Sequence, residues 1–391
     1  MITVEEARAI IMRHVPLQGK QRLPLDAAVG HVLAADVVSP VPYPLFDMSA
    51  MDGYAVGGPT GPWRRVGALA AGAHFGGALK ADECVRIFTG AQVPTEAYAV
   101  LQQEHCTERD GVMHWTGGPF AQGANIRRKA ESVQQGDLLL AKGMVLHAAG
   151  VGLLASCGLA EVTVHTPPRV SVVRSGGEFI EPSEPSEGRI HSSNEHMLLA
   201  ATRQAGCVVA GAPLLADDVV DDVRNALLSA TRQGDVVITT GGVSVGDHDL
   251  LLPALKDLGA TIHFHGVAQK PGKPMLFATL NGVPVFALPG NPRAVMVLFW
   301  EYVLPFLRAM QGAADPWPRT ELLPIAAAIT VKGVRTEFRA ARVREGHVHL
   351  LADEGSHMLR TLVLADAIAY LPPDVRTLLP GDAVEIHYLP Q

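Results

Sequence analysis

The chain has 391 residues, a formal net charge of -7 and a hydrophobic content of 48%. This length exceeds one ordinary core and predicts several domains, whereas the acidic balance argues against nucleic-acid binding, which needs a surplus of Lys and Arg. The four cysteines are far apart and form no Cys-x-x-Cys pair, so the sequence indicates neither a zinc knuckle nor a disulfide framework and favours a reducing cytosol.

The amino terminus predicts a helix rather than a secretion signal. The segment MITVEEARAIIMRH carries Glu5 and Glu6 where a signal peptide carries positive charge, and Thr3 with Glu6 forms a capping-box pattern. The most apolar stretch, VLHAAGVGLLASCGLA (145–160), is shorter than the roughly 20 residues that a membrane helix needs. We expect a buried helix there, and a cytoplasmic protein that does not enter membranes.

The first part of the chain predicts two interleaved domains. Residues 46–136 are rich in Gly and Pro and contain short alternating runs such as ECVRIFTG and YAVLQQEH, which indicate a small β-rich domain. We expect this domain to be inserted into an elongated amino-terminal domain made of residues 1–45 and 137–167. The helices expected near residues 3–14 and 147–158 then belong to the same domain.

Residues 168–314 alternate short apolar runs with helical segments. The runs RVSVVRSG, CVVAGAPLL, DVVITT and IHFHGVA read as strands, and MLFATL with VPVFAL reads as a strand pair joined by Asn281-Gly282. Ser192 and Glu195 form a capping-box pattern at the start of a helix that ends before Gly206. Further helices are expected over residues 217–234, 249–259 and 294–310. The alternation predicts a mostly parallel sheet covered on both faces, a three-layer α/β domain.

Residues 315–391 follow the DPWP linker and change the pattern again. Runs such as LLPIAAAITV and AVEIHYL predict a second β-rich domain.

Three expected strand ends of the α/β domain carry glycine, and parallel strand ends face one crevice. In TTGGVSVGDHD, the glycines let backbone N–H groups approach an anion, and a serine offers a hydroxyl. Asp247 and Asp249 could hold a hard cation. The alternative is a glycine turn in which Asp249 caps the next helix. LPGNP places Asn291 as a helix cap before Pro292, and RSGGEF brings two glycines and the carboxylate of Glu178 to the end of the first strand. Together the three ends predict a phosphate-containing ligand.

The segment QKPGKP supplies positive charge through Lys270 and Lys273. A solvated lysine loop is the alternative, but beside three anion-binding loops these lysines are expected to stabilise a phosphate or an oxyanion. His263 and His265 share one strand face without a third ligand, which favours packing over metal binding. The strings PLFDMSAMDGYAV and TGAQVP read either as turns or as loops whose polar side chains reach a substrate.

Taken in order, SAMDGYAV, IFTGAQVP, ITTGGVSVGDHD, QKPGKP and LPGNP resemble the molybdopterin molybdenumtransferase family, the MoeA proteins and the gephyrin E domain. The resemblance covers essentially the whole chain. It implies an elongated amino-terminal region with an inserted β domain, a three-layer α/β ligand domain and a carboxy-terminal β-barrel. It also implies a homodimer whose active cleft is shared between subunits.

The resemblance further implies a reaction, in which molybdate is inserted into adenylylated molybdopterin (molybdopterin-AMP) with Mg2+ and release of AMP. Possible protein partners are a molybdopterin adenylyltransferase and molybdoenzyme acceptors. The implied carboxylates around the metal are Asp249, Asp218 and Glu178, and Lys270 and Lys273 take developing phosphate charge. Asp52 and Thr89 come from the inserted domain, across the dimer. The other implied substrate-binding residues are Gly241, Gly242, Ser244, Pro289, Gly290, Asn291, Pro292, Arg335 and Ser356.

The chain departs from the family pattern at three positions. Gly177 and Ser132 stand where the family usually has acids, and Gly266 stands where it has a lysine. A glycine cannot replace a carboxylate that holds Mg2+, so a diverged, non-catalytic protein that binds a molybdopterin-type ligand or a protein partner is the alternative to the enzyme. A dinucleotide oxidoreductase would need a Gly-x-Gly-x-x-Gly turn after the first strand, and a stand-alone adenylyltransferase would need only the middle domain.

Overall fold

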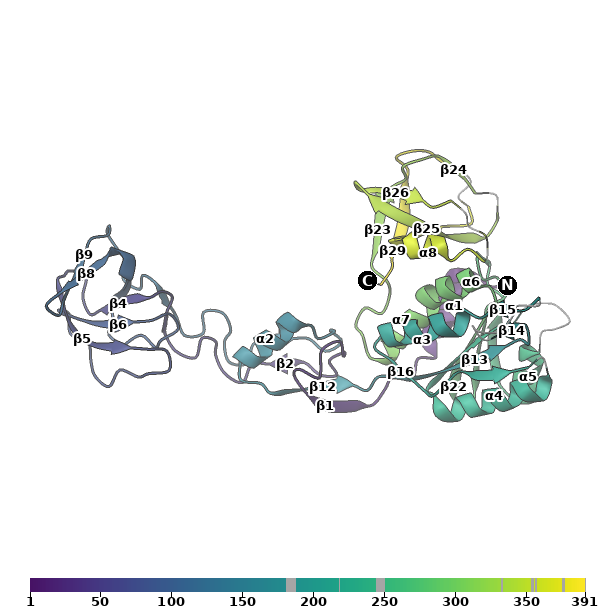
Figure 1. Cartoon of the computed structure of the whole chain (residues 1–391), viewed down its shortest axis with the longest axis horizontal. Helices are drawn as coiled ribbons and strands as arrows, with labels where there is room; N and C mark the ends of the chain where they lie inside the picture. The colour runs from purple at the N-terminus through teal and green to yellow at the C-terminus, as the bar shows by residue number, and fades with distance from the viewer. Residues whose placement is uncertain are drawn as a thin grey trace.

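The computed structural model describes residues 1–180, 188–217, 219–243, 250–331, 333–352, 355, 357–374 and 377–390. Figure 1 shows an elongated chain in which an α/β unit and a carboxy-terminal β unit lie together at one end and a small β unit lies at the other end. A narrow connecting segment joins the two ends. Among the described residues, no helix is both long enough and apolar enough to span a bilayer.

The connecting segment is built from antiparallel strand pairs whose members are far apart in sequence. Strand β1 pairs with β12, and β2 pairs with β11. A small core of buried leucines and valines holds them together. The elements of this segment are β1 (Lys20–Pro24), β2 (Val37–Val38), β11 (Leu138–Leu140), α2 (Ala148–Ser156) and β12 (Glu161–His165).

Helix α2 corrects the expectation of a buried helix. Only Gly150 and Leu154 of α2 are buried, because the helix covers a two-stranded ribbon on one side and faces solvent on the other. The apolar residues of this stretch therefore pack on one side into the small core of the connecting segment, and the helix is not surrounded by protein.

The β unit at the far end contains a six-stranded sheet in the order β7-β4-β6-β5-β9-β8. The expected β-rich character of this region is thereby confirmed. Its elements are β3 (Met48–Ser49), β4 (Gly53–Val56), β5 (Trp63–Leu69), β6 (Glu83–Ile87), β7 (Ala99–Gln102), the short 3-10 helix η1 (Gln103–His105), β8 (Cys106–Arg109), β9 (Val112–Trp115) and β10 (Ile126–Arg127).

The α/β unit is a three-layer sandwich around a sheet in the order β16-β13-β18-β22-β21-β19. Pairings among β13, β16, β17, β18 and β22 are parallel, and those of β21 with β19 and β22 are antiparallel. The expected mostly parallel sheet is confirmed. Its strands are β13 (Arg169–Ser175), β16 (Val208–Val209), β17 (Leu214–Ala216), β18 (Val236–Thr240), β19 (Thr261–His265), β21 (Leu276–Leu280) and β22 (Val283–Leu288), and a separate short pair is β14 (Phe179–Ile180) with β15 (Ile190–His191).

Helices cover both faces of this sheet because successive strand residues alternate between two cores. Val172, Ile238 and Phe286 face one core, whereas Val173 and Val237 face the other. Helices α4 and α5 cover the second core, and the remaining helices cover the first. The helices are α1 (Val4–Arg13), α3 (Asn194–Gln204), α4 (Val220–Gln233), α5 (Leu251–Asp257), α6 (Pro292–Leu298), the π-helix η2 (Phe299–Val303) and α7 (Leu304–Met310).

Helix α1 begins with the expected capping box, in which Thr3 and Glu6 exchange side-chain and backbone hydrogen bonds. Its position, however, corrects one expectation. Val4, Ala7 and Ile11 of α1 pack into the core of the α/β unit, whereas α2 packs into the connecting segment. The two helices therefore do not share a core, although the domain boundaries themselves stay predictions.

Three local expectations in the α/β unit are wrong. The single helix expected over residues 294–310 is divided into α6, η2 and α7. Helix α3 starts at Asn194, one residue too late for Ser192 and Glu195 to form a capping box, and the helix has no side-chain cap. Burial opposes ionisation of Glu195, but hydrogen bonds from Ser192, its own backbone and Arg174 outweigh this effect and lower the pKa of Glu195.

The segment CVVAGAPLL gives two short strands, β16 and β17, instead of one, and both pair with β13.

The carboxy-terminal unit is a sheet in the order β20-β25-β27-β29-β23, with β26 paired to β25. A single bridge joins Ile325, just after β23, to Val348 of β26; a closed barrel stays a prediction. The elements are β20 (Gln269–Lys270), β23 (Thr320–Pro324), β24 (Ile329–Thr330), β25 (Thr336–Arg344), β26 (His347–Leu350), α8 (Arg360–Leu364), β27 (Ala367–Leu371), β28 (Thr377–Leu378) and β29 (Ala383–Tyr388).

A buried ionic cluster ties three of these elements together. Glu301 of η2 is 1% exposed, and its carboxylate lies 2.5 Å from Nη2 of Arg8 in α1 and 2.8 Å from Nδ1 of His387 in β29. Because buried charges are costly without partners, this cluster fixes the amino-terminal helix and the carboxy-terminal sheet against the same turn of helix.

Replacing Glu301 by alanine is expected to lower the free energy of unfolding by about 3–5 kcal/mol, because Arg8 loses its buried counter-charge. Urea denaturation measures the change. The matched control is Glu161→Ala, which breaks an ion pair with Arg22 whose side chains are 45% and 73% exposed; its loss is expected to stay below about 1 kcal/mol. Equal losses in the two variants would contradict the importance of the buried cluster.

Candidate active site

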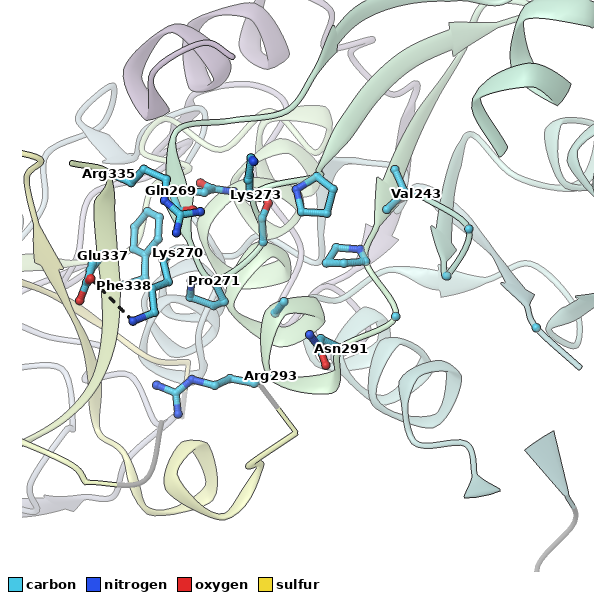
Figure 2. A pocket seen from close by; sticks show the side chains of 18 of the residues that line it. Val243, Gln269, Lys270, Pro271, Lys273, Asn291, Arg293, Arg335, Glu337 and Phe338 are labelled. Atoms are coloured by element: carbon cyan, nitrogen blue, oxygen red, sulfur yellow. Dashed lines mark hydrogen bonds and ion pairs between the residues drawn. The ribbon is translucent and has the colours of Figure 1, made fainter. Parts of the chain in front are cut away.

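A pocket of about 610 Å³ opens between the α/β unit and the carboxy-terminal sheet (Figure 2). One wall is formed by the carboxyl ends of β13, β18 and β22, and the other by β20 and β25. The structure brings all three of the expected glycine-bearing strand ends to this pocket. The common crevice expected from the sequence is confirmed in position.

The glycine pair after β18 is required by close backbone packing. Gly241 and Gly242 have φ values of 89° and 64°, which side chains rarely adopt. A Cβ atom on Gly241 would lie 2.7 Å from the carbonyl oxygen of Ser175, at the end of β13. The two strand ends can approach each other only because this position is glycine. Gly241, Gly242, Pro289, Gly290 and Asn291 line the pocket, whereas Pro292 begins α6 just behind it.

A buried asparagine that the sequence analysis missed joins two of the strand ends. Asn194 donates from Nδ2 to Oγ1 of Thr240, at the end of β18, at 2.8 Å and to the carbonyl of Gly290, after β22, at 2.8 Å. The Thr240 hydroxyl in turn donates to the carbonyl of Pro289 at 3.3 Å. This clamp fixes the pocket wall.

The pocket carries an excess of positive charge in an acidic chain. Its described lining contains two carboxylates, Glu178 and Glu337, and five cationic side chains, although the whole chain has a formal net charge of -7. Such a local excess attracts an anionic ligand. The cations are Lys270, Lys273, Arg293, Arg335 and Arg339.

Both lysines expected from QKPGKP lie in the pocket, and the loop that carries them is held by the carboxy-terminal sheet. Gln269 and Lys270 form β20, which pairs in parallel with Thr336 and Glu337 of β25. Nζ of Lys270 lies 3.7 Å from Oε1 of Glu337, as the dashed line in Figure 2 shows. Lys273 is exposed and lines the pocket. Neither lysine is therefore on a freely solvated loop.

Two arginines and one acid of the pocket were not predicted. Arg293 lies in the first turn of α6, is 2% exposed, and donates from Nη1 to Oγ1 of Thr361 at 2.7 Å. A buried cation is unfavourable at the positive end of a helix. Arg293 follows Asn291-Pro292 at the start of an otherwise apolar helix, and this unusual position could have indicated a binding residue. Arg339 and Glu337 come from β25, whose place beside the pocket the sequence did not reveal.

Several expected site residues lie outside the described residues. They are Asp218, Ser244, Asp249 and Ser356, together with the candidate cation ligand Asp247. Of the expected metal carboxylates, the structure describes Glu178, which is exposed at the pocket edge. Within the described residues, no cluster of three metal-ligating side chains occurs. Arg335, expected from the carboxy-terminal domain, does line the pocket and donates from Nη1 to the carbonyl of Gln269 at 3.4 Å.

Asp52 and Thr89 lie together, but in the β unit at the other end of the chain (Figure 1). The Thr89 amide and hydroxyl donate to Oδ1 of Asp52 at 2.8 and 2.7 Å. These two hydrogen bonds lower the pKa of Asp52, so this carboxyl is ionised at neutral pH. The backbones of the two motifs also bond, since Ser49 donates to Ala91. Neither residue reaches the pocket of its own chain.

Asp47, the other acid of the SAMDGYAV region, has a local role. It accepts from the guanidinium of Arg128 at 2.6 Å and from the amide of Lys129 at 2.8 Å. Burial opposes its ionisation, but the hydrogen bonds outweigh this effect and lower its pKa. Asp47 therefore stabilises the local turn, as the turn interpretation of PLFDMSAMDGYAV predicts.

The three departures from the family pattern differ in their surroundings. No other atom lies within 4 Å of a Cβ placed on Gly177, so a larger side chain would fit there. Gly266 has φ of 92°, a conformation that a lysine adopts only with strain. Ser132 is exposed in the distant region beside Tyr43. Arg174, three residues before Gly177, pairs with Glu195 at 2.8 Å.

Family models match three consecutive parts of the chain. They are the MoeA N-terminal region (domain I and II) over residues 2–158, a probable molybdopterin binding domain over residues 171–309, and the MoeA C-terminal region (domain IV) over residues 323–389.

Curated relatives match the chain over nearly its full length. A molybdopterin molybdenumtransferase of Haemophilus influenzae is 31% identical, over 99% of this chain and 98% of the relative. Molybdopterin molybdenumtransferase 2 of Mycobacterium tuberculosis is 33% identical, over 99% of each chain. Among solved structures, a molybdopterin biosynthesis MoeA protein from Pyrococcus horikoshii superposes with a TM-score of 0.83 at 26% identity, covering all of both chains.

Proposed function

This chain belongs to the molybdopterin molybdenumtransferase family, and from this premise we propose that it inserts molybdate into adenylylated molybdopterin in a Mg2+-dependent reaction that releases AMP. The observation that carries the proposal is the cationic pocket at the ends of β13, β18 and β22. Dianionic molybdate and the phosphates of the adenylylated substrate are the ligands that such a pocket selects.

The pocket residues have distinct roles in this proposal. The glycine-bearing strand ends admit the phosphates, since Gly241 and Gly242 present backbone without side chains. Release of AMP breaks the phosphoanhydride bond between AMP and the molybdopterin phosphate; water supplies the incoming oxygen, and negative charge develops on the leaving phosphate oxygen. Lys273, exposed at the pocket, and Lys270 stabilise that charge as it develops. Arg293 and Arg335 hold the bound anions in place.

Among the described residues, one carboxylate of the pocket, Glu178, is of the kind that binds Mg2+. This ion takes oxygen ligands and is usually bound by one or two carboxylates together with substrate phosphates, and Glu178 presents an exposed carboxylate at the pocket edge. Asp249 and Asp218 are proposed to complete the set. When bound, Mg2+ would neutralise phosphate charge.

The proposed enzyme is a cytoplasmic homodimer in which Asp52 and Thr89 of one subunit complete the pocket of the other. The support is that the ionised Asp52 and the exposed Thr89 lie together in the β unit at the far end of the chain from their own pocket (Figure 1). A molybdopterin adenylyltransferase is proposed to deliver the substrate, and molybdoenzymes to accept the product.

The direct test is AMP release from adenylylated molybdopterin by the purified protein, which we expect only when both molybdate and Mg2+ are present. Binding without release would favour the non-catalytic alternative.

The Mg2+ requirement is expected to shift in opposite directions in two variants. Glu178→Gln removes a ligand charge and should raise the Mg2+ concentration for half-maximal AMP release by about tenfold. Gly177→Asp adds a carboxylate where the structure has space, and should lower it. A Mg2+ titration of AMP release measures both values.

Gly76→Asp is the matched control for Gly177→Asp, because Gly76 is also exposed and sterically free but lies in the distant β unit. It should leave the Mg2+ dependence unchanged. An unchanged Mg2+ requirement in Glu178→Gln would remove Glu178 from the proposed metal site.

A further inference from the structure

A buried hydrogen bond connects the lysine-bearing loop to the interior of the protein. The hydroxyl of Tyr302 donates to Oε1 of Gln269, and the two residues are 1% and 0% exposed. Gln269 immediately precedes Lys270 and lines the pocket, where Figure 2 shows it beside Arg335. A polar pair that is fully removed from water is costly unless its hydrogen bonds are complete.

Gln269 holds the loop at several points. Its Nε2 donates to the carbonyl of Gly272, between the two lysines, at 3.1 Å, and its own carbonyl accepts from Arg335 at 3.4 Å. The bond from Tyr302 to Oε1 determines which end of the amide faces inward, and so directs Nε2 to Gly272. The side-chain orientation of Gln269 therefore controls the path of the backbone that carries Lys270 and Lys273.

Tyr302 is itself held rigidly. It lies in η2, next to Glu301, whose carboxylate binds Arg8 and His387. Glu301 and Tyr302 are both buried and have different partners. The π-helix, which is wider than an α-helix, lets these neighbouring side chains point in different directions. Burial raises the pKa of Tyr302 well above its usual range, so the hydroxyl remains protonated and can act as a donor. The hydrogen bond thus runs from a fixed framework to the pocket loop.

We propose that Tyr302 and Gln269 are positioning residues for the reaction, whose hydrogen bond holds the two lysines where phosphate charge develops. Neither side chain transfers a proton or contacts a reacting atom; each acts through the loop of residues 270–274. The proposal rests on the function proposed above.

The test compares Tyr302→Phe with the double variant Tyr302→Phe/Gln269→Met. Tyr302→Phe leaves Oε1 of Gln269 buried without its donor, so both the melting temperature and turnover should fall. The double variant replaces both partners by apolar side chains of similar shape, which should restore the melting temperature toward that of the wild type but not the contact with Gly272. We expect kcat for AMP release to remain about ten- to a hundredfold below wild type in both, with little change in KM.

Tyr388→Phe is the matched control. The Tyr388 hydroxyl donates to Oε2 of Glu321 at 2.8 Å within the carboxy-terminal sheet, away from the loop, so its kcat should equal that of the wild type. Recovery of kcat together with the melting temperature in the double variant would show that the pair is only structural and would overturn the proposal.

Hydrogen exchange of the loop separates this proposal from the proposed function. Faster amide exchange over residues 270–274 in both variants, but not in Tyr388→Phe, is expected whether or not AMP release is detected. Unchanged exchange in Tyr302→Phe would refute the positioning role, whereas absence of AMP release by the wild type would refute the proposed function alone.

Discussion

Replacing Lys273 by methionine is expected to lower kcat for molybdate-dependent AMP release by about 10²–10³-fold, the loss typical of removing one preorganised group that stabilises transition-state charge. Lys273 is exposed at the pocket, so its loss leaves no buried partner unpaired, and methionine keeps most of the side-chain volume. The melting temperature should therefore change little. Steady-state kinetics with saturating molybdate and Mg2+ measures the effect.

The control for this variant is Lys256→Met, which removes the same charge from the exposed surface of α5, outside the described pocket. Its kcat should match that of the wild type. The loss in Lys270→Met is harder to assign to the reaction alone, because Lys270 also pairs with Glu337. Turnover within a factor of about two of wild type in Lys273→Met would exclude the proposed charge stabilisation.

Replacing Asp52 by asparagine is expected to reduce AMP release by at least about tenfold while the fold is retained. An amide oxygen can still accept both hydrogen bonds from Thr89, so the variant removes the charge and keeps the shape. Asp82→Asn, at an exposed acid of the same β unit, is the matched control and should remain active.

The same variant tests whether the active cleft is shared between subunits. Asp52→Asn and Lys273→Met are each expected to retain at most about a tenth of wild-type activity, but random mixed dimers would contain one site with both residues intact. Co-expression should then restore about a quarter of wild-type activity, because a two-fold dimer has two equivalent sites. No recovery, in material shown to contain mixed dimers, would place Asp52 outside the partner's site.

The layered α/β fold could be predicted because its sequence signals are local and mutually consistent. The strand DVVITT is buried on both faces and forms β18 as expected. Asn281 and Gly282 join β21 to β22 with positive φ at both residues, as a tight hairpin turn requires. Gly206 follows the end of α3 in the left-handed conformation.

The failures concern interactions that the local sequence does not contain. Glu195 was expected to cap its own helix, but Arg174, 21 positions earlier, pairs with it. The helix expected over residues 294–310 is interrupted by η2, where Glu301 binds His387 and Tyr302 binds Gln269, both buried and both in distant segments. Helix propensity depends on the local sequence and does not reflect such tertiary contacts.

The candidate site was likewise predicted where its residues lie in local motifs and was missed where distant segments meet. The glycine-bearing strand ends and both lysines could be found from local motifs. The candidate site residues taken from these strand ends and from QKPGKP that the structure describes line the pocket, except Pro292. Arg339 and Glu337 could not, since only the pairing of β20 with β25 brings the carboxy-terminal sheet to the pocket. Asn194 was missed because its hydrogen bonds link strand ends 46 and 96 positions away.

The most direct test of this account is a titration of adenylylated molybdopterin into the purified protein, with and without molybdate and Mg2+, while bound ligand and released AMP are followed together. We expect AMP release only when both molybdate and Mg2+ are present, together with molybdenum retained on the pterin product. Tight binding of the substrate without AMP release under any of these conditions would contradict it.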